Sequence, residues 1–238
     1  HQYIIDGYDE IVDPTGMMGA VVEVDADVVI GSAIATQSLL KAVERAGYQV
    51  SGIVVEAIAT GEVTLSEEEK ELGVLLVDIG GGKTDYSFFK DGRIKYYDSI
   101  PIGGEHITND LVIGLKVSYN EADRLKKQFP LAQKSLINND QSITIYSIGE
   151  SRQKLIKISD VVEIIEARVD EIFTILNDKI EAAGIKDDIA AGVVLVGQGI
   201  YHVVGAKDVA QSKLGLPTRL VNPKLPAGLK LGYVTSLG

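Results

Sequence analysis

The sequence contains no cysteine and has little positive charge. Without cysteine the chain forms no disulfide, and it offers no thiolate as a nucleophile or a metal ligand. Lysine and arginine number 23 against 34 aspartates and glutamates, so the formal net charge is −11. A chain this acidic lacks the basic surface that nucleic-acid binding requires, and we expect no DNA or RNA partner.

Long hydrophobic runs are also missing. No stretch approaches the roughly 18 consecutive apolar residues of a membrane-spanning helix. Hydrophobic residues still make up 45% of the 238 positions, which is enough for the core of one large domain or of two lobes. The first residues, His1 to Ile5, lack an initiator methionine and the layout of a signal peptide. We therefore expect a fragment that begins inside a fold.

The first third of the chain predicts short elements separated by turns. Residues 20–31 alternate apolar and acidic side chains, which predicts a strand with one wet face. Residues 36–46 carry one apolar helical stripe that ends at Gly47, a residue suited to a helix C-cap. Residues 53–55, Ile-Val-Val, predict a short buried strand. Residues 66–69, Ser-Glu-Glu-Glu, form a capping box that begins a brief helix.

The rest of the chain predicts a sheet covered by helices. Residues 74–98 have the pattern of a three-strand meander, with turns at residues 80–82 and 91–92. Residues 159–184 carry a broad apolar face at helical spacing, which predicts the longest helix. Further helices are expected after Gly104 and over residues 120–129, and further strands over residues 142–148, 154–158, 190–196 and 220–221.

The sharpest motif is the segment Asp78-Ile79-Gly80-Gly81-Gly82-Lys83-Thr84 after an apolar strand. Bare glycine N–H groups can approach an anion closely, so the turn suits a phosphate. Asp78 is placed to hold Mg²⁺, through water because that ion sheds its hydration shell reluctantly, and the Thr84 hydroxyl is a further donor. Glycines that only turn a tight hairpin remain the alternative.

A second glycine segment, Gly197-Gln198-Gly199, also follows an apolar strand. Its bare backbone suits a flat ring or a phosphate. Taken alone, it is better explained as a strand-to-helix turn that needs glycine for its dihedral angles.

A third candidate is the pair Asp123 and Lys126, which lie one helical turn apart on the same face. The acid suits ribose hydroxyls and the lysine suits the edge of a purine. A solvent-exposed ion pair between the two residues is the competing explanation.

The order of these segments resembles the second half of the actin, heat-shock chaperone and sugar-kinase ATPase superfamily. Within it the chain is similar to the bacterial cell-division family FtsA. Residues 74–85 are similar to the phosphate-binding hairpin of that family, residues 121–126 to its ribose-contacting helix, and the Gly197 segment to its adenosine motif. Further similar stretches are residues 3–7, 13–17, 41–47, 68–73, 100–104 and 107–110.

The resemblance implies an α/β, actin-like (ribonuclease H-like) ATPase fold, with a mixed sheet, flanking helices and a small α+β subdomain. It implies part of a family-specific extra subdomain in residues 1–50 and a linker and helix of the first lobe in residues 51–73. The second lobe follows, with a nucleotide-binding core in residues 74–117, an inserted subdomain in residues 118–188, and the adenosine motif with the C-terminal segment in residues 189–238. The first phosphate loop is expected before His1. Residues 233–238 are similar to the start of the helix that precedes a C-terminal amphipathic membrane helix.

The resemblance also implies ATP and Mg²⁺ as ligands, with weak or absent ATP hydrolysis. No residue is identified as catalytic, because the sequence offers no obvious general base. The implied ligand contacts are Asp78, Gly80, Gly81, Gly82, Lys83, Thr84, Asp123, Lys126, Gly197, Gln198 and Gly199, with Asp78 at the metal.

The family comparison implies a cytoplasmic scaffold at the inner face of the cell membrane, at the division septum. It implies self-association into filaments and binding of the C-terminal tail of the tubulin-like protein FtsZ through residues 118–188. Contact with the membrane is expected only through a C-terminal helix outside this chain. The alternatives are a small-molecule kinase of the same superfamily and a pilus-assembly actin-like protein.

Three residues depart from the family pattern. Lys83 stands where the family has a hydroxyl residue, Asp123 replaces a longer glutamate, and Gln198 interrupts a glycine pair. Lys83 either adds a charge-assisted phosphate contact or competes with Mg²⁺, so the departure moves nucleotide affinity in a direction that the sequence leaves open.

Overall fold

A computed structural model describes residues 2–11, 13–26, 28, 30–147 and 153–221, which belong to two compact units, His1–Val54 and Val55–Gly238. The first unit contains the strands β1 (Gln2–Ile5), β2 (Tyr8–Ile11) and β3 (Val22–Asp25) and the helix α1 (Ala33–Arg45). The strands form an antiparallel sheet in the order β2-β1-β3. The carboxylate of Asp6 accepts hydrogen bonds from the N–H groups of Ala20 and Val21 at 2.8–3.0 Å. These bonds join the end of β1 to the residues just before β3.

Two predictions in the first unit hold in part. The helix predicted over residues 36–46 is α1, which begins a few residues earlier and ends before Gly47. The strand predicted over residues 20–31 is only Val22–Asp25, and Val22 and Val24 are both exposed. The alternation of apolar and acidic residues therefore predicted the strand. Its valine side chains, however, are not buried within the described residues.

The buried strand predicted at residues 53–55 is wrong. Ile53 and Val54 are 62% and 68% exposed, and the chain passes directly into α2 (Glu56–Thr64), with Val55 as its N-cap. β-Branched residues favour a strand only when a neighbouring strand is there to pair with them. Residues 46–55 contain no helix or strand.

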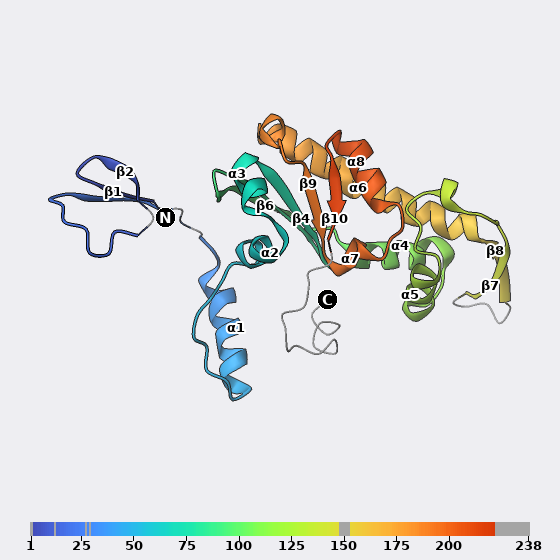
Figure 1. The fold of residues 1–238 in the computed structure, drawn as a ribbon. Helices are drawn as coiled ribbons and strands as arrows, with labels where there is room; N and C mark the ends of the chain where they lie inside the picture. The colour runs from blue at the N-terminus through green and yellow to red at the C-terminus, as the bar shows by residue number, and fades with distance from the viewer. Residues whose placement is uncertain (1, 12, 27, 29, 148–152, 222–238) are drawn as a thin grey trace. The chain divides into compact units, whose positions relative to one another are not determined.

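The second unit is built on a five-stranded sheet in the order β10-β9-β4-β5-β6 (Figure 1). A hairpin turn at residues 91–92 joins β5 to β6, as predicted, and β4, β5 and β6 are antiparallel neighbours. On the other side of β4, β9 and β10 run parallel to it. The strands are β4 (Val74–Ile79), β5 (Thr84–Lys90), β6 (Arg93–Ile100), β9 (Val193–Val196) and β10 (Thr218–Leu220).

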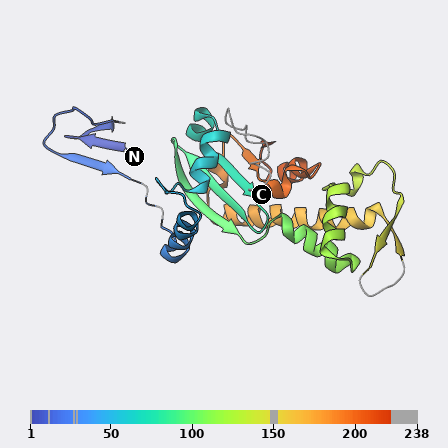
Figure 2. The ribbon, with the colours of Figure 1, turned by 90° about the horizontal axis from the view of Figure 1, so that it is seen from below.

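Helices cover both faces of this sheet, as Figures 1 and 2 show from two directions. Successive residues of a strand point to opposite faces, so Leu75 and Val77 enter one core cluster while Val74 and Leu76 enter another. The larger cluster packs against α4 (Gly104–Leu115), α6 (Ile158–Ala182) and α8 (Ala206–Leu214). The smaller one lies on the side of α2 and α3 (Glu67–Leu72), the helix whose predicted capping box at Ser66 and Glu69 is present.

The long helix α6 runs from the sheet to the strand pair β7 (Ser142–Tyr146) and β8 (Gln153–Lys157) (Figures 1 and 2). Its whole predicted apolar face is buried. Ile145 of β7 and Ile156 of β8 belong to the same core cluster as the sheet, so the predicted inserted subdomain shares one continuous core with it. The remaining helices are α5 (Tyr119–Gln128), α7 (Gln198–Tyr201) and the 3-10 turns Lys134–Leu136 and Lys186–Asp188.

Two further expectations concern membranes. Within the described part of the chain, no helix is long and apolar enough to cross a bilayer. The helix start expected at residues 233–238 lies outside the described residues.

The end of the strand expected over residues 142–148 also lies outside them.

Candidate functional site

Glycines from three distant segments meet at the end of β4. A Cβ added at Gly199, in α7, would stand 2.3 Å from the carbonyl oxygen of Gly80. A Cβ at Gly104, the first residue of α4, would stand 2.6 Å from the Cα of Gly199, and one at Gly103 would stand 2.5 Å from the Gly80 oxygen. These contacts leave no room for a side chain, so Gly103, Gly104 and Gly199 serve close packing of backbone on backbone.

Gly197 has both a conformational and a packing reason to be glycine. Its φ is +99°, and a Cβ there would stand 2.3 Å from the carbonyl oxygen of Ile79 and 2.5 Å from Oδ1 of Asp78. The prediction that this segment needs glycine for its turn is therefore confirmed at Gly197. The same turn brings the backbone of α7 beside the strand that carries Asp78.

The turn at Gly80, Gly81 and Gly82 is different. None of the three residues has a positive φ, and a Cβ at Gly82 would meet nothing within 4 Å. The carbonyl oxygens of Gly80 and Gly81 accept hydrogen bonds of 2.9 and 2.8 Å from the first N–H groups of α4, at Gly104 and Glu105. Among the described residues, the N–H groups of Gly81 and Gly82 donate to no protein acceptor.

This arrangement fits an anion and is not explained by turn geometry alone. The N–H groups of α4 bind the carbonyl oxygens of the turn. Among the described residues, the N–H groups of Gly81 and Gly82 have no protein acceptor, and the space at Gly82 is open. Successive bare N–H groups of this kind form anion-binding concavities.

Asp78 is half-buried on β4, just before this turn. Burial, with smaller contributions from the negative charges of Glu56 and Asp85, raises the pKa of Asp78 to about 6, and the positive charge of Lys83 opposes that rise. Among the described residues, no three His, Asp or Glu side chains are grouped to hold a metal ion. Asp78 therefore suits Mg²⁺ only as one carboxylate ligand, with water and phosphate oxygens as the other ligands.

Thr84 and Lys83 make protein contacts of their own. Thr84 is fully buried, and its hydroxyl donates to the carbonyl oxygen of Ile102 at 2.7 Å. That donor is therefore engaged within the protein. Lys83 is half-exposed and forms an ion pair with Asp85, and its Nζ lies 3.7 Å from Oε2 of Glu56, in the first turn of α2. The hydrogen bond with Asp85 raises the pKa of Lys83.

A pocket of about 710 Å³ opens beside this turn. Asp123 and Lys126 of α5 line one part of it, and Gln198 and Gly199 of α7 line another. Gly199 lines this pocket and also packs against Gly80, so the pocket adjoins the glycine turn. Its remaining lining residues are Lys127, Pro130, His202 and Val203.

Asp123 and Lys126 do not pair with each other. Lys126 Nζ donates to the Gly104 carbonyl oxygen at 3.1 Å and to Thr108 Oγ1 at 2.7 Å, and burial lowers the pKa of Lys126. Asp123 instead forms an ion pair of 2.6 Å with Lys127, four residues on. The alternative that Asp123 and Lys126 form a surface ion pair is therefore wrong. Lys126 has neutral partners, so its charge stays available on the pocket wall.

All the residues predicted for the site thus lie in two adjoining regions, the pocket and the end of β4. Sequence reasoning missed His202, Glu56 and Asp85 as residues of this region. His202 stands one helical turn after Gln198, and this spacing was the available signal. Nothing local in the sequence places Glu56 near Lys83.

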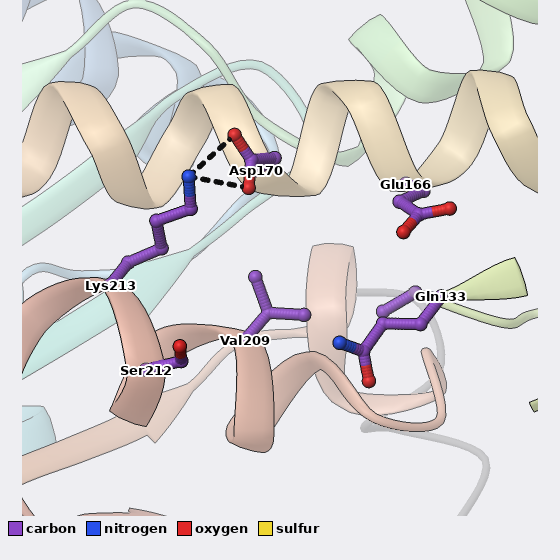
Figure 3. A pocket seen from close by; sticks show the side chains of 7 residues that line it. Gln133, Glu166, Asp170, Val209, Ser212 and Lys213 are labelled. Carbon is purple, nitrogen blue, oxygen red and sulfur yellow. Dashed lines mark hydrogen bonds and ion pairs between the residues drawn. The ribbon is translucent and has the colours of Figure 1, made fainter. Parts of the chain in front are cut away.

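A second, smaller cavity of about 90 Å³ lies between α6 and α8. Figure 3 shows Glu166 and Asp170 on α6 facing Gln133 and Lys213 across it. Lys213 forms an ion pair of 2.7 Å with Asp170, and Glu166 accepts a hydrogen bond of 3.1 Å from the N–H of Lys134. None of the predicted ligand contacts lines this cavity.

The sequence matches a family model described as "Cell division protein FtsA" over residues 75–238. It is 38% identical over 237 residues to the cell division protein FtsA of Bacillus subtilis, an alignment that covers 100% of this chain and 53% of that protein. It is 35% identical over 227 residues to FtsA of Pseudomonas aeruginosa, with 95% of this chain and 54% of that protein covered. The chain thus spans about half the length of these relatives.

Solved structures with the same fold are actin-like. The structure of MreB5 of Spiroplasma citri bound to ADP has a TM-score of 0.67 and 20% identity, with 81% of this chain and 62% of that chain covered. A MamK double helical filament has a TM-score of 0.61 and 19% identity, with 81% of this chain and 61% of that chain covered. At these identities the likeness establishes the actin-like ATPase fold that the sequence predicted.

Proposed function

The chain belongs to the FtsA family of cell division proteins, and we propose that its second unit grips the nucleotide of an actin-like division scaffold. The nucleoside would lie in the pocket beside Asp123, Lys126 and Gln198, and its phosphates would pass over Gly199 to Gly81 and Gly82. The nucleotide proposed is ATP or ADP with Mg²⁺.

One observation carries this proposal: Gly81 and Gly82 keep bare N–H groups, and the space at Gly82 is open, near a pocket of about 710 Å³. Gly80 and Gly81 are fixed through their carbonyl oxygens by α4, so the turn is organised before any ligand arrives. Such preorganised N–H donors bind anions without a further ordering cost.

The other side chains have separate parts in this proposal. Lys126 would meet the ribose or purine edge, since its ammonium group is held at the pocket wall by Gly104 and Thr108. Asp78 would orient the water shell of Mg²⁺, and the ion would supply charge neutralisation for the phosphates. Thr84 supports the turn from below through Ile102.

Nucleotide binding is tested by titrating the full-length protein with ATP and Mg²⁺ in a calorimeter. Gly82→Asp adds a carboxylate where a Cβ meets no atom, so we expect a normal fold and a loss of binding through charge repulsion. Gly52→Asp is the matched control, because a Cβ there also meets nothing within 4 Å. Equal ATP affinity in both variants would show that phosphates do not lie at Gly82.

We further propose that the protein self-associates into filaments and binds the C-terminal tail of FtsZ through residues 118–188, at the inner face of the membrane. The filament proposal is supported by the fold shared with the MamK double helical filament, and the FtsZ proposal by family membership. Residues 118–188 also expose Tyr146 on β7 and Leu155 on β8, at 62% and 70%, which suits an apolar peptide contact.

These partners are tested separately. Electron microscopy of the full-length protein with ATP and Mg²⁺ tests for filaments, and their absence at high protein concentration would contradict self-association. Fluorescence anisotropy with a labelled FtsZ tail peptide tests the second contact. We expect Leu155→Asp to weaken peptide binding and Leu72→Asp, at an exposed leucine on α3, to leave it unchanged.

Family membership favours this scaffold over the kinase and pilus-assembly alternatives. A kinase would consume ATP only when an acceptor molecule is added. A coupled ATPase assay with and without sugar or carboxylate acceptors separates the two functions.

A further inference from the structure

One lysine stands among three carboxylates at the end of the glycine turn. Lys83 directly follows Gly82, forms an ion pair with Asp85 and lies 3.7 Å from Glu56. Its charge also acts on Asp78. Glu56, Asp78 and Asp85 come from α2, β4 and β5, so three elements direct negative charge toward one ammonium group.

This charge pattern works against a polyphosphate. A nucleotide tail at Gly81 and Gly82 would approach these three carboxylates and also that of Glu105, which lies 3.2 Å from the position of a Cβ at Gly81. Lys83 is the cation next to the turn. A divalent ion normally offsets repulsion of this kind. A lysine in the same place supplies part of that positive charge permanently.

Lys83 can turn toward a phosphate without leaving its partner unpaired. Asp85 also accepts a hydrogen bond of 3.1 Å from the Tyr97 hydroxyl, so its carboxylate keeps one donor when the ammonium group moves. The Lys83 side chain is 53% exposed, so about half of it faces solvent. An ammonium group that reaches a phosphate makes a charge-assisted hydrogen bond, which is roughly twice as strong as a neutral one.

We propose that Lys83 sets the metal requirement of this site: its ammonium group contacts the phosphates of a nucleoside di- or triphosphate and allows binding when no divalent cation is present. This inference rests on the proposed nucleotide site. It adds that the nucleotide can bind there without a divalent cation. Replacing Lys83 by a hydroxyl residue therefore makes nucleotide binding more dependent on Mg²⁺.

The test compares the dissociation constants of ADP and ATP in excess Mg²⁺ and in excess EDTA, measured by calorimetry on the full-length protein. The ratio of the EDTA value to the Mg²⁺ value is the readout. We expect K83T to raise this ratio about tenfold over the wild type, the effect of losing one charge-assisted contact. K83R keeps the charge, and we expect the wild-type ratio.

A charge-matched control is K95T. Lys95 pairs with Asp91 at the opposite end of the β5–β6 hairpin, so its loss changes net charge equally without touching the turn. We expect the wild-type ratio in K95T. A salt titration adds a second readout, since metal-free binding by the wild type should weaken with salt more steeply than that by K83T.

The possible failures are distinguishable. A wild-type protein that binds nucleotide neither with Mg²⁺ nor with EDTA would overturn the proposed function itself. Binding with the same ratio in wild type, K83T and K83R would overturn only the role of Lys83. A loss in K83T that appears with Mg²⁺ but not with EDTA would also overturn it, because Lys83 would then act on the metal complex. Thermal unfolding of each variant verifies that this half-exposed position leaves the fold intact.

Discussion

Gly82 and Gly199 illustrate how the same residue type serves different ends within one site. A Cβ at Gly82 meets no atom within 4 Å, whereas one at Gly199 would stand 2.3 Å from a backbone oxygen. Repetition of glycine in a sequence cannot separate these cases, because it does not reveal what approaches each backbone atom.

We therefore predict opposite outcomes for Gly82→Ala and Gly199→Ala. Gly82→Ala should change the free energy of unfolding by less than about 0.5 kcal/mol but weaken nucleotide binding, since its methyl group occupies the phosphate space. Gly199→Ala should cost about 1–3 kcal/mol, because the backbone must move to admit the methyl group. Urea denaturation and ATP titration of both variants check this. A strongly destabilised Gly82→Ala would contradict the phosphate interpretation of this turn.

Thr84 provides a second prediction, because its place in the motif and its place in the structure differ. Thr84→Val removes the donor to the Ile102 carbonyl oxygen and should cost about 1–3 kcal/mol, the usual effect of leaving a buried acceptor unpaired. Thr84→Ser keeps the donor and should retain that hydrogen bond. We expect ATP affinity to stay near the wild-type value in Thr84→Val, measured at a temperature where the variant is folded. A folded, equally stable Thr84→Val that binds ATP poorly would instead place the hydroxyl at the phosphate.

The sequence predicted the residue types of the site but not all of their partners. Asp78, Gly82 and Gly199 could be selected because Asp78 lies near the end of a buried strand and the two glycines follow such strands, and a strand end is where a backbone turn becomes accessible. The ion pair of Lys83 with Asp85 and its proximity to Glu56 were not predictable, since they depend on where α2 settles against the sheet. The pairing of Asp123 with Lys127, and not Lys126, was equally open, because both spacings lie on one helix face.

Among the elements, periodic burial decided which predictions succeeded. The helix α6 repeats apolar residues at helical spacing over its whole length, and the residues of its predicted apolar face are all buried. The run Val74–Ile79 became β4 because β5 and β9 supply partners on both sides. The run at residues 53–55 has similar side chains but precedes the start of α2. Strand propensity alone therefore does not separate the two runs, and the outcome depends on tertiary pairing.

A pH-dependent contact joins two of these elements. Asp98 on β6 accepts hydrogen bonds from Lys179 on α6 at 2.9 Å and from the Tyr86 hydroxyl at 3.0 Å. Lys179, followed by the backbone N–H of Ser99 and the Tyr86 hydroxyl, lowers the pKa of Asp98 below its usual value of 3.8. A carboxyl group with a lowered folded-state pKa stabilises the fold above its unfolded-state pKa, and this contribution is lost as the pH falls through the folded-state pKa.

We predict that Asp98→Asn is less stable than the wild type at about pH 6.5 and that the difference shrinks by about pH 3. The expected difference at the higher pH is below about 1 kcal/mol, because Asp98 and Lys179 are both partly exposed to solvent. Urea denaturation of both proteins at the two pH values gives the measurement. A difference that stays constant across this pH range would mean that the carboxylate charge of Asp98 does not contribute.

For the molecule as a whole, family membership and local physics answer different questions. The order of the motifs identified the FtsA family and its actin-like fold, which the family model and the solved structures support. The resemblance implied a first boundary after residue 50, and the structure divides into the units His1–Val54 and Val55–Gly238. This division falls at the segment 46–55, which contains no helix or strand. The three-stranded sheet precedes that segment in the chain, and the five-stranded sheet follows it. The finer boundaries at residues 74, 118 and 189 stay predictions.

The two-unit organisation predicts where a protease cuts this chain first. Tyr48 lies in segment 46–55 and is 71% exposed, and chymotrypsin prefers large apolar or aromatic side chains in its specificity pocket. Exposed segments without regular hydrogen bonding are the preferred sites of proteolysis, so brief digestion should leave a stable fragment beginning at Gln49. Mass spectrometry of the fragments identifies the cut, and Tyr48→Ser should remove it while leaving digestion elsewhere unchanged. If chymotrypsin cuts within the five-stranded sheet before it cuts at Tyr48, the second unit is the less stable of the two. That outcome would contradict the stability expected from its continuous core of buried strands and helices.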